Sequence, residues 1–264
     1  MAGRPPTPAR VVEIEYSELT QPGARATNED GVGHWPEADG LVLAVADGIG
    51  EAATGRVAST IALEVLGREL GASAELPVVK RLRRAVQAAN VELYQKAVTV
   101  PELAGMATTL TVTALGAHGL VTAHVGDCRL FLLRDGTLTQ LTKDHTWVWA
   151  HLPGAPEQVR GVRGQPRRYS LPRCLGQELI VSVDVLSMAV RPGDVFFQCS
   201  DGVHGVLEEH EITELLESHP PDAACRALVR RARECASDDD ASVQVATVRA
   251  IDAAAARSWW RRGA

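Results

Sequence analysis

The stretch TLTVTALGAHGLVTAHVGDCRLFLLRDGT, residues 109–137, decides the fold class of this chain. It contains three β-branched or apolar runs, at 109–115, 120–125 and 130–133, and each is typical of a strand. The segment Arg134-Asp135-Gly136-Thr137 after the third run has the residues of a tight hairpin turn. The stretch therefore predicts neighbouring antiparallel strands.

Helical patterns lie on both sides of these strands. An apolar run at 41–46 predicts a buried strand that ends at Asp47-Gly48, and apolar residues then recur at helical spacing until Gly71. A second helix is expected to begin at Pro77. The remaining expected elements are strands at 180–185, 195–199 and 243–248 and helices at 211–218 and 222–235. Two helix pairs around strand blocks predict an α+β fold with mainly antiparallel sheets between helical layers.

The chain is predicted to form one domain, because 264 residues with 45% apolar residues can build a single core on large sheets. We expect this domain to span residues 14–250, with an N-terminal extension at 1–13 and a C-terminal tail at 251–264. Between about 145 and 173, prolines, glycines and arginines interrupt every period. A polar stretch of that length inside a domain is typical of a functional flap or a flexible insertion.

Composition argues against several classes of protein. A net charge of −6 and 4% aromatic residues are not the basic, aromatic signature of nucleic-acid binding. Five cysteines without a CxxC pair indicate reduced, cytoplasmic usage and neither a disulfide framework nor a zinc site. No apolar core of a signal peptide is present in residues 1–10, and no run approaches the roughly 18 apolar residues of a membrane helix. We therefore expect a cytoplasmic protein without a transmembrane segment.

Five short acidic clusters each lie beside an apolar run. They are Glu29-Asp30, Asp47-Gly48, Gly126-Asp127, Asp201-Gly202 and Asp238-Asp239-Asp240. Each cluster alone is most simply explained as a turn. Carboxylates at several strand ends can also converge on Mg²⁺ or Mn²⁺, which prefer oxygen ligands. The repetition of strand, Asp and Gly favours a metal site, in which Gly48, lacking a Cβ, can bring its own carbonyl close to the ion.

Other side chains near the clusters have weaker signals. Arg25 lies four residues before Glu29 and is either a surface charge or a bidentate fork for phosphate oxygens. His124 lies in a strand run, where a hydrogen-bonded structural histidine is expected, and His145 and His204 have no partner at metal-ligand spacing.

Short motifs in a fixed order carry a resemblance to a known family. They are Arg25-Ala-Thr-Asn-Glu-Asp30, Ala46-Asp-Gly-Ile-Gly50, Gly105-Met-Ala-Thr-Thr-Leu110, His124-Val-Gly-Asp-Cys-Arg129, Leu141-Thr-Lys-Asp-His145, Leu175-Gly176, Pro192-Gly-Asp194, Cys199-Ser-Asp-Gly202 and Asp239 before Ser242-Val243. In these motifs the chain resembles the metal-dependent protein phosphatases of the PPM family, the protein phosphatase 2C type, in their bacterial serine/threonine form. The resemblance implies an α-β-β-α sandwich with metals at one end of two sheets.

The resemblance also implies roles for individual residues. Asp47 is expected to bridge two metal ions, Asp201 and Asp239 to complete the shell of the first ion, and Glu29 with the Gly48 carbonyl to hold the second. Asp30 is expected to act through a bound water, Asp127 to hold a third ion with Asp201, and Arg25 to bind the substrate phosphate. Ile49 occupies a position where some eukaryotic members carry a histidine proposed as general acid.

The three adjacent aspartates differ in their expected roles. The family spacing and the alternation along Ser242-Val243-Gln244-Val245 make Asp239 the ligand and Asp238 a solvated turn residue. Asp240 occupies the position where the family usually has Asn. An amide at that position can satisfy neighbouring backbone groups without adding charge. Asp240→Asn is expected to be mild or neutral, because it restores the family's residue and relieves like-charge repulsion.

The expected function is hydrolysis of phosphoserine and phosphothreonine in proteins, with autophosphorylated bacterial Ser/Thr kinases among the substrates. Two Mn²⁺ or Mg²⁺ ions, with a possible third, would lower the pKa of a shared water, whose hydroxide attacks phosphorus directly without a phosphoenzyme. We expect a monomer. Two alternatives stay open: a non-catalytic pseudophosphatase that binds phosphoproteins, and a stress-signalling phosphatase that acts on an anti-sigma-factor antagonist. Relatives of the latter kind typically lack the flap, which favours the kinase-opposing function.

Overall fold

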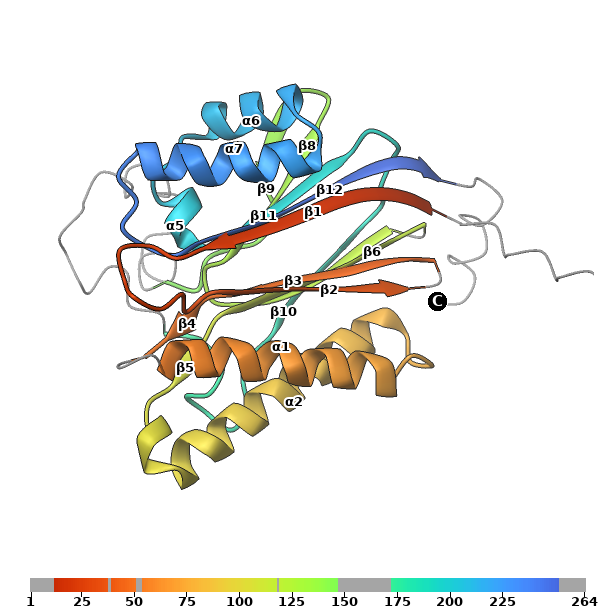
Figure 1. Ribbon diagram of the computed structural model, residues 1–264. Coiled ribbons are helices and arrows are strands. Elements are labelled where there is room, and N and C mark those ends of the chain that lie inside the picture. The colour runs from red at the N-terminus through yellow and green to blue at the C-terminus, as the bar shows by residue number, and fades with distance from the viewer. Residues whose placement is uncertain (1–11, 38, 51–53, 118, 147–171, 252–264) are drawn as a thin grey trace, which may run out of the picture.

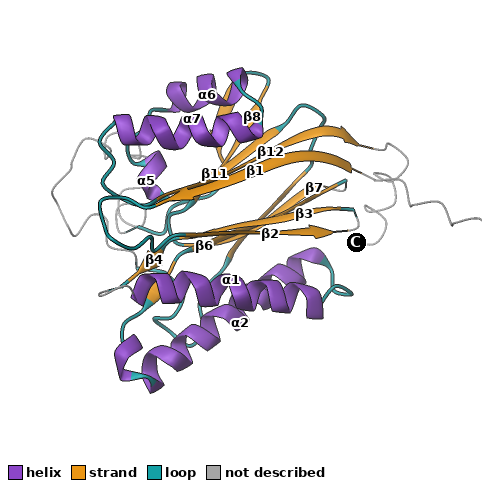
Figure 2. Cartoon of the chain, in the orientation of Figure 1, coloured by secondary structure: helices purple, strands orange, loops and turns teal. Residues whose placement is uncertain are grey.

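Two antiparallel sheets face each other between two layers of helices (Figures 1 and 2). The computed structural model describes residues 12–37, 39–50, 54–117, 119–146 and 172–251. All strand pairs in these residues are antiparallel. The predicted α+β fold, an α-β-β-α sandwich, is confirmed.

Each of the two large sheets has five strands. In the first sheet the order is β1 (Val12–Gln21), β12 (Ala241–Ile251), β11 (Val195–Cys199), β8 (Arg129–Arg134) and β9 (Thr137–Gln140). In the second sheet the order is β10 (Asp184–Met188), β7 (Gly119–Val125), β6 (Leu110–Gly116), β3 (Gly40–Ala46) and β2 (Gly31–Glu37). A small separate pair is formed by β4 (Gly48–Ile49) and β5 (Ala107–Thr108).

The helices form the two outer layers. The second sheet is covered by α1 (Thr54–Ala72) and α2 (Val78–Thr99), and a 3₁₀ turn at Pro101–Leu103 follows α2. The first sheet is covered by α6 (Glu209–Ser218) and α7 (Pro221–Glu234). A single short turn of helix, α5 (Asp201–His204), continues directly from the end of β11.

Side-chain alternation along the strands builds three apolar layers. In β3, Leu41 and Leu43 point between the two sheets, whereas Val42 and Ala44 pack toward α1 and α2. Between the first sheet and α6 and α7, the ring of Phe131 stacks on that of another strand residue, Phe197, at a centroid distance of 5.7 Å. Because every sheet is buried on both faces, the free ends of the strands are where polar groups can gather.

Several elements differ from the expectations. The Asp135-Gly136 hairpin is confirmed, with φ of 52° and 75° at its two central residues. The strand expected at 180–185 is wrong in position, because β10 begins at Asp184 and Ile180 is 75% exposed. The preceding loop is held instead by the side-chain amide of Asn90, which donates to the Glu178 carbonyl at 2.9 Å.

The structure bears on part of the expected domain limits. The first sheet begins at Val12, two residues before the expected start, and ends at Ile251. Most of the expected flap, residues 147–171, and the terminal segments 1–11 and 252–264 lie outside the described residues. Among the helices that the structure describes, none has the length and apolar character needed to cross a membrane. All five cysteines are free.

Candidate metal centre

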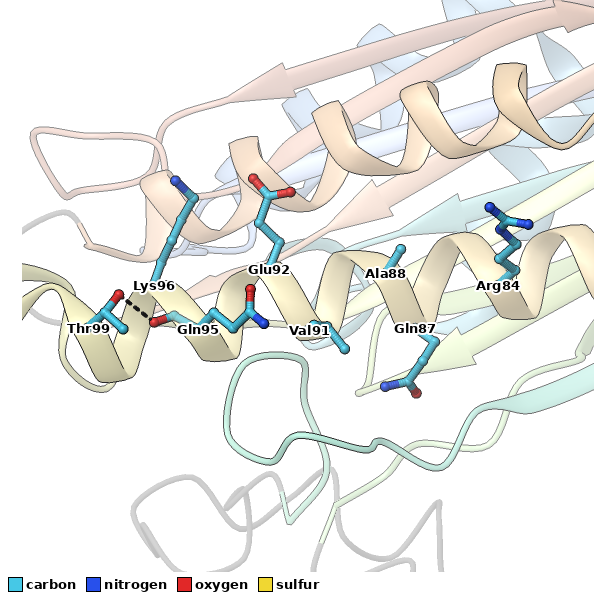
Figure 3. A pocket seen from close by; sticks show the side chains of 8 residues that line it. All are labelled: Arg84, Gln87, Ala88, Val91, Glu92, Gln95, Lys96 and Thr99. Atoms are coloured by element: carbon cyan, nitrogen blue, oxygen red, sulfur yellow. Dashed lines mark hydrogen bonds between the residues drawn. The ribbon is translucent and has the colours of Figure 1, made fainter.

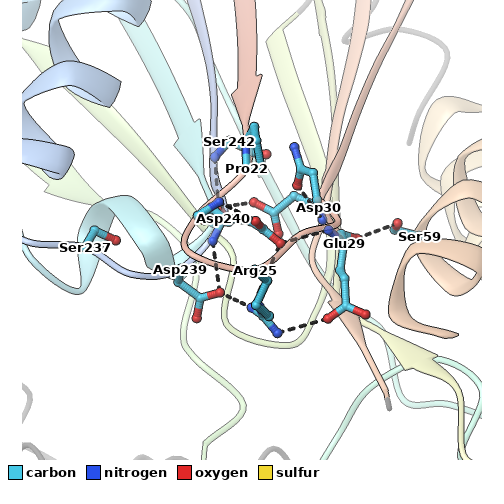
Figure 4. Close-up of polar contacts among 12 residues, drawn as sticks. Pro22, Arg25, Glu29, Asp30, Ser59, Ser237, Asp239, Asp240 and Ser242 are labelled. Atoms are coloured by element: carbon cyan, nitrogen blue, oxygen red, sulfur yellow. Dashed lines mark hydrogen bonds and ion pairs between the residues drawn. The ribbon is translucent and has the colours of Figure 1, made fainter. Parts of the chain in front are cut away.

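The five acidic clusters lie near one another, since Asp47 feels the charges of Asp30, Asp127, Asp201 and Asp239. Figure 4 shows two of the clusters, Glu29-Asp30 and Asp239-Asp240, side by side. The chain segments of the five clusters are the connection from β1 to β2, the ends of β3 and β7, the start of α5, and the turn from α7 to β12. Antiparallel pairing brings alternate strand ends to the same edge of a sheet, so residues more than 200 positions apart become neighbours.

Arg25 lies between two of the predicted ligands. Its guanidinium donates to the Glu29 carboxylate at 2.9 Å and to the Asp239 carboxylate, as Figure 4 shows. About half of the Arg25 side chain is exposed, 51%, whereas the Glu29 side chain is only 6% exposed. Arg25 therefore presents a cation to solvent at the edge of an acidic cluster, which fits the predicted role of a phosphate-binding group better than that of an isolated surface charge.

The backbone around Asp47 is fixed by two threonines. The Asp47 N–H donates to the Thr109 hydroxyl at 2.9 Å, and the Thr108 hydroxyl donates to the Asp47 carbonyl at 2.8 Å. These bonds leave the Asp47 carboxylate facing the other aspartates. Burial and the nearby charges of Asp201 and Asp30 raise its pKa well above the ordinary value.

Gly48 meets its surroundings through its backbone. A Cβ at this position would overlap the carbonyl oxygen of Gly55 and lie 2.5 Å from that of Glu29. Its N–H donates to the Glu29 carbonyl at 3.2 Å, and the Ser59 hydroxyl donates to the same oxygen at 2.6 Å. Only glycine fits this close approach. The role of the Gly48 carbonyl as a metal ligand stays a prediction.

Asp30 is a buried carboxylate that interacts with the hydroxyl groups of Ser200 and Ser242. The Ser200 hydroxyl donates to it at 2.6 Å. Burial outweighs this bond and raises the pKa of Asp30 to about 8. Burial and the charge of Asp239 likewise raise the pKa of Asp201 to about 6. Carboxylates with raised pKa values in one place indicate a deficit of positive charge.

Asp127 lies in a turn that two histidines hold. The Gly126 N–H donates to His145 Nδ1 at 3.1 Å, and His204 Nε2 lies 3.0 Å from the Asp127 carbonyl. His124 bridges the Thr111 hydroxyl and the Lys143 carbonyl, so the expected structural role of this histidine is confirmed. The Asp127 Oδ1 atom, by contrast, is buried without a hydrogen-bond partner.

The donor set fits divalent cations of the Mg²⁺ and Mn²⁺ type. All of its members are oxygens, one of them is the unpaired Asp127 Oδ1, and the elevated pKa values of Asp47 and Asp30 would be reversed by nearby positive charge. Within the described residues, however, no three acidic, histidine or cysteine side chains converge tightly enough to hold an ion as they stand. Two of the predicted ligands, Glu29 and Asp239, contact Arg25 instead.

The three adjacent aspartates of the last acidic cluster differ in burial. Asp238 is exposed, the Asp239 side chain is 46% exposed and contacts Arg25, and Asp240 is 2% exposed. Asp240 accepts hydrogen bonds only from backbone N–H groups, those of Gly23 at 2.7 Å and Glu29 at 2.8 Å. These contacts bear on the expected mild effect of Asp240→Asn, which stays a prediction: both hydrogen-bonded neighbours are donors, whereas an amide has one acceptor oxygen.

The sequence did not assign roles to the hydroxyl residues around the cluster. Ser59, Thr108, Thr109 and Ser200 all bond to a predicted ligand or to its backbone. Thr108 and Thr109 belong to the quoted motif Gly105–Leu110, which was a usable signal. Ser59 lies inside a regular helical pattern and gave none.

A separate hollow lies on the outer face of α2 (Figure 3). Its lining residues are Arg84, Gln87, Ala88, Val91, Glu92, Gln95, Lys96 and Thr99. The lining includes no predicted metal ligand, so this hollow is distinct from the candidate centre.

Comparison with known proteins identifies the family of the chain. The family model described as protein phosphatase 2C matches residues 23–219, which include all predicted site residues except Asp239. The chain belongs to the protein phosphatase 2C family. Among its relatives, the serine/threonine protein phosphatase PstP of Mycobacterium tuberculosis is 33% identical over 237 residues, which are 89% of this chain and 45% of that protein. The chain therefore spans about half the length of this relative.

Two further members of the family are similar. The serine/threonine phosphatase Stp of Listeria monocytogenes is 33% identical over 199 residues, 74% of this chain and 79% of that protein. A crystal structure of the catalytic domain of PstP in complex with two manganese ions superposes with a TM-score of 0.76 at 31% identity, over 90% of this chain and 99% of that one.

Proposed function

We propose that this member of the protein phosphatase 2C family hydrolyses phosphoserine and phosphothreonine in proteins with the help of two Mn²⁺ or Mg²⁺ ions. The observation that carries the proposal is the convergence of buried oxygen ligands around Asp47 with Arg25 at the exposed edge. The relatives named serine/threonine phosphatases, and the two manganese ions in the PstP complex, support it.

Each residue has a defined part in this proposal. Asp47 would bridge the two ions, with Asp201 and Asp239 on one side and Glu29 and the Gly48 carbonyl on the other. Asp30 would hold a water, and Asp127, whose Oδ1 lacks a partner, would hold a third ion with Asp201. When bound, the ions supply an acidified water for direct attack on phosphorus and neutralise charge on the phosphate.

The residues of the chain supply binding and position. Arg25 would donate from two N–H groups of its planar guanidinium to two oxygens of the phosphate. In this structure the guanidinium donates to the carboxylates of Glu29 and Asp239. Thr108, Thr109 and Ser59 hold the backbone from which Asp47 and Glu29 project. No cysteine or serine nucleophile is required, since water itself attacks the phosphorus.

The proposed substrates are phosphorylated Ser/Thr kinases in the cytoplasm, a compartment that suits five free cysteines. The test is to incubate the protein with Mn²⁺ and either an autophosphorylated Ser/Thr kinase domain or a phosphorylated anti-sigma-factor antagonist. We expect rapid phosphate release from the kinase and slow release from the antagonist. The reverse preference would favour the stress-signalling function, and release from neither would favour a pseudophosphatase. Asp47→Asn serves as the inactive control.

A further inference from the structure

Asp240 joins two segments of the site that are far apart in the sequence. It lies at the end of the turn before β12, and its two carboxylate oxygens accept from different backbone groups of the connection between β1 and β2. Oδ1 accepts from Gly23 at 2.7 Å, and Oδ2 accepts from Glu29 at 2.8 Å. These two residues bracket Arg25.

Backbone contacts next to Asp240 tighten the same junction. The Ala24 N–H donates to the Asp238 carbonyl at 2.8 Å. A Cβ on Gly23 would lie 2.5 Å from the Asp239 carbonyl carbon, so the backbones of these two segments are in direct contact. The connection from Gly23 to Glu29 is thus fixed at both of its ends by the buried Asp240 side chain.

The two groups that hydrogen-bond to the Asp240 carboxylate are both backbone donors, and the Arg25 guanidinium lies 3.9 Å from Oδ2. A carboxylate can accept through both oxygens, whereas Asn has one acceptor oxygen and would turn its NH₂ group toward the other N–H. A buried N–H that loses its acceptor is costly, and charge-assisted bonds of this kind are stronger than neutral ones. In this chain the negative charge is therefore part of the contact, at a position where the family usually has Asn.

We propose that Asp240 is a positioning residue, which holds Arg25 and Glu29 in place for phosphate and metal through the Gly23 and Glu29 amides. Its catalytic consequence rests on the proposed phosphatase function, whereas the contact itself does not. We do not propose Asp240 as a metal ligand. Of the three aspartates, Asp238 is exposed, Asp239 is the proposed metal ligand and Asp240 is the positioning residue.

The test compares Asp240→Asn with Asp238→Asn. The control also removes one negative charge, but from an exposed side chain two residues earlier in the sequence. Amide hydrogen exchange of the metal-free proteins, resolved to single residues, is the first readout. We expect exchange at Gly23 or Glu29 to accelerate about tenfold or more in Asp240→Asn and to stay unchanged in Asp238→Asn. Unchanged protection of both amides in a folded Asp240→Asn protein would overturn the inference.

Calorimetric Mn²⁺ titration and phosphopeptide kinetics are the second readout. Loss of such an outer partner typically weakens metal affinity or activity ~10–100-fold, so we expect weaker Mn²⁺ binding and a raised KM in Asp240→Asn alone. Equal effects in both variants would mean that charge, and not position, matters. If Asp240→Asn does not fold, the wild-type protein still decides, because Gly23 and Glu29 amides that exchange as fast as in an unstructured peptide would contradict the proposal. A wild type that hydrolyses nothing but shows the exchange effect would refute only the proposed function.

Discussion

Neighbouring aspartates in the turn before β12 differ in what surrounds them. Asp239 faces Arg25 with almost half of its side chain exposed, whereas Asp240 is enclosed by backbone donors. A metal ligand needs carboxylate lone pairs that are free to bind the ion, whereas both oxygens of a positioning residue are taken up by hydrogen bonds. Burial and hydrogen bonding therefore separate two carboxylates that the sequence presents as equivalent.

Asp239→Asn is expected to abolish phosphatase activity, because it replaces an anionic ligand by a neutral group of the same shape. The loss in kcat/KM should exceed the ~10–100-fold typical of an outer partner of a ligand. Steady-state kinetics on a phosphothreonine peptide measures it, with Asp238→Asn as the charge-matched control. Full activity of Asp239→Asn would move the ligand to another residue.

Arg25→Lys is expected to raise KM for phosphate monoesters although charge is kept. A point ammonium cannot reproduce a two-donor fork, and a hydrogen bond to a charged group contributes about 1.5–3 kcal/mol, which corresponds to roughly 10–100-fold. Mn²⁺ affinity, measured by calorimetry, should change little. Kinetics like those of the wild type would mean that Arg25 is a surface residue.

At the scale of elements, the crossing of β4 and the first turn of α1 depends on glycine. Gly48→Ala should destabilise the protein by about 3 kcal/mol, the upper part of the range for overpacking, because the added methyl overlaps the Gly55 carbonyl. Urea unfolding measures the change. Gly71→Ala near the end of α1 is the control, since no atom lies within 4 Å of its Cβ position, and it should stabilise by about 0.5–1 kcal/mol. Equal effects at both sites would argue against the close approach.

Strongly periodic elements could be predicted from the sequence, and edge strands could not. The strands β3, β6 and β7 carry continuous apolar runs because both faces are buried. The edge strand β2 contains two glycines and Pro36, which an edge tolerates but which weaken any strand pattern. The edge strand β10 was placed too early because exposed apolar residues such as Ile180 resemble a buried run.

The same distinction holds for the candidate site. The acidic clusters could be proposed from the sequence, because Asp47, Asp127 and Asp201 each follow a buried strand and Asp240 precedes one. The sequence could not predict the partners of Asp240 or Asp30, because Glu29 and Ser200 lie 211 and 170 residues away from them and only the packed sheets bring them together. Contacts across the junction of the two sheets are a property of topology.

At the scale of the whole molecule, the fold of the sandwich holds a cluster of buried carboxylates together. When no cation is bound, this cluster lowers the free energy of unfolding. Burial raises the pKa of Asp30 to about 8, so between pH 6.5 and 8 the folded protein binds more protons than the unfolded chain. The free energy of unfolding in EDTA should therefore fall by about 1–2 kcal/mol as pH rises through this window. Urea unfolding at both pH values measures it.

Two comparisons make this pH prediction specific. His124, whose pKa burial lowers to about 4, is neutral in the folded protein above pH 6.5. Its deprotonation in the unfolded chain opposes the fall by only about 0.4 kcal/mol in that window. Asp30→Asn should make the fall in EDTA shallower, and millimolar Mn²⁺ should remove it by stabilising the ionised cluster. A stability that is independent of both pH and Mn²⁺ would show that these carboxylates do not form one site.

The most direct test of the proposed metal-dependent phosphatase is phosphate release from a phosphothreonine peptide, measured with one preparation in Mn²⁺, in EDTA, and after Mn²⁺ is restored in excess. Oxygen ligands hold such ions weakly, so the chelator should remove them. We predict turnover in Mn²⁺, none in EDTA, and full recovery when Mn²⁺ is restored. Undiminished phosphate release in EDTA would contradict the proposal that this cluster of carboxylates works through divalent ions.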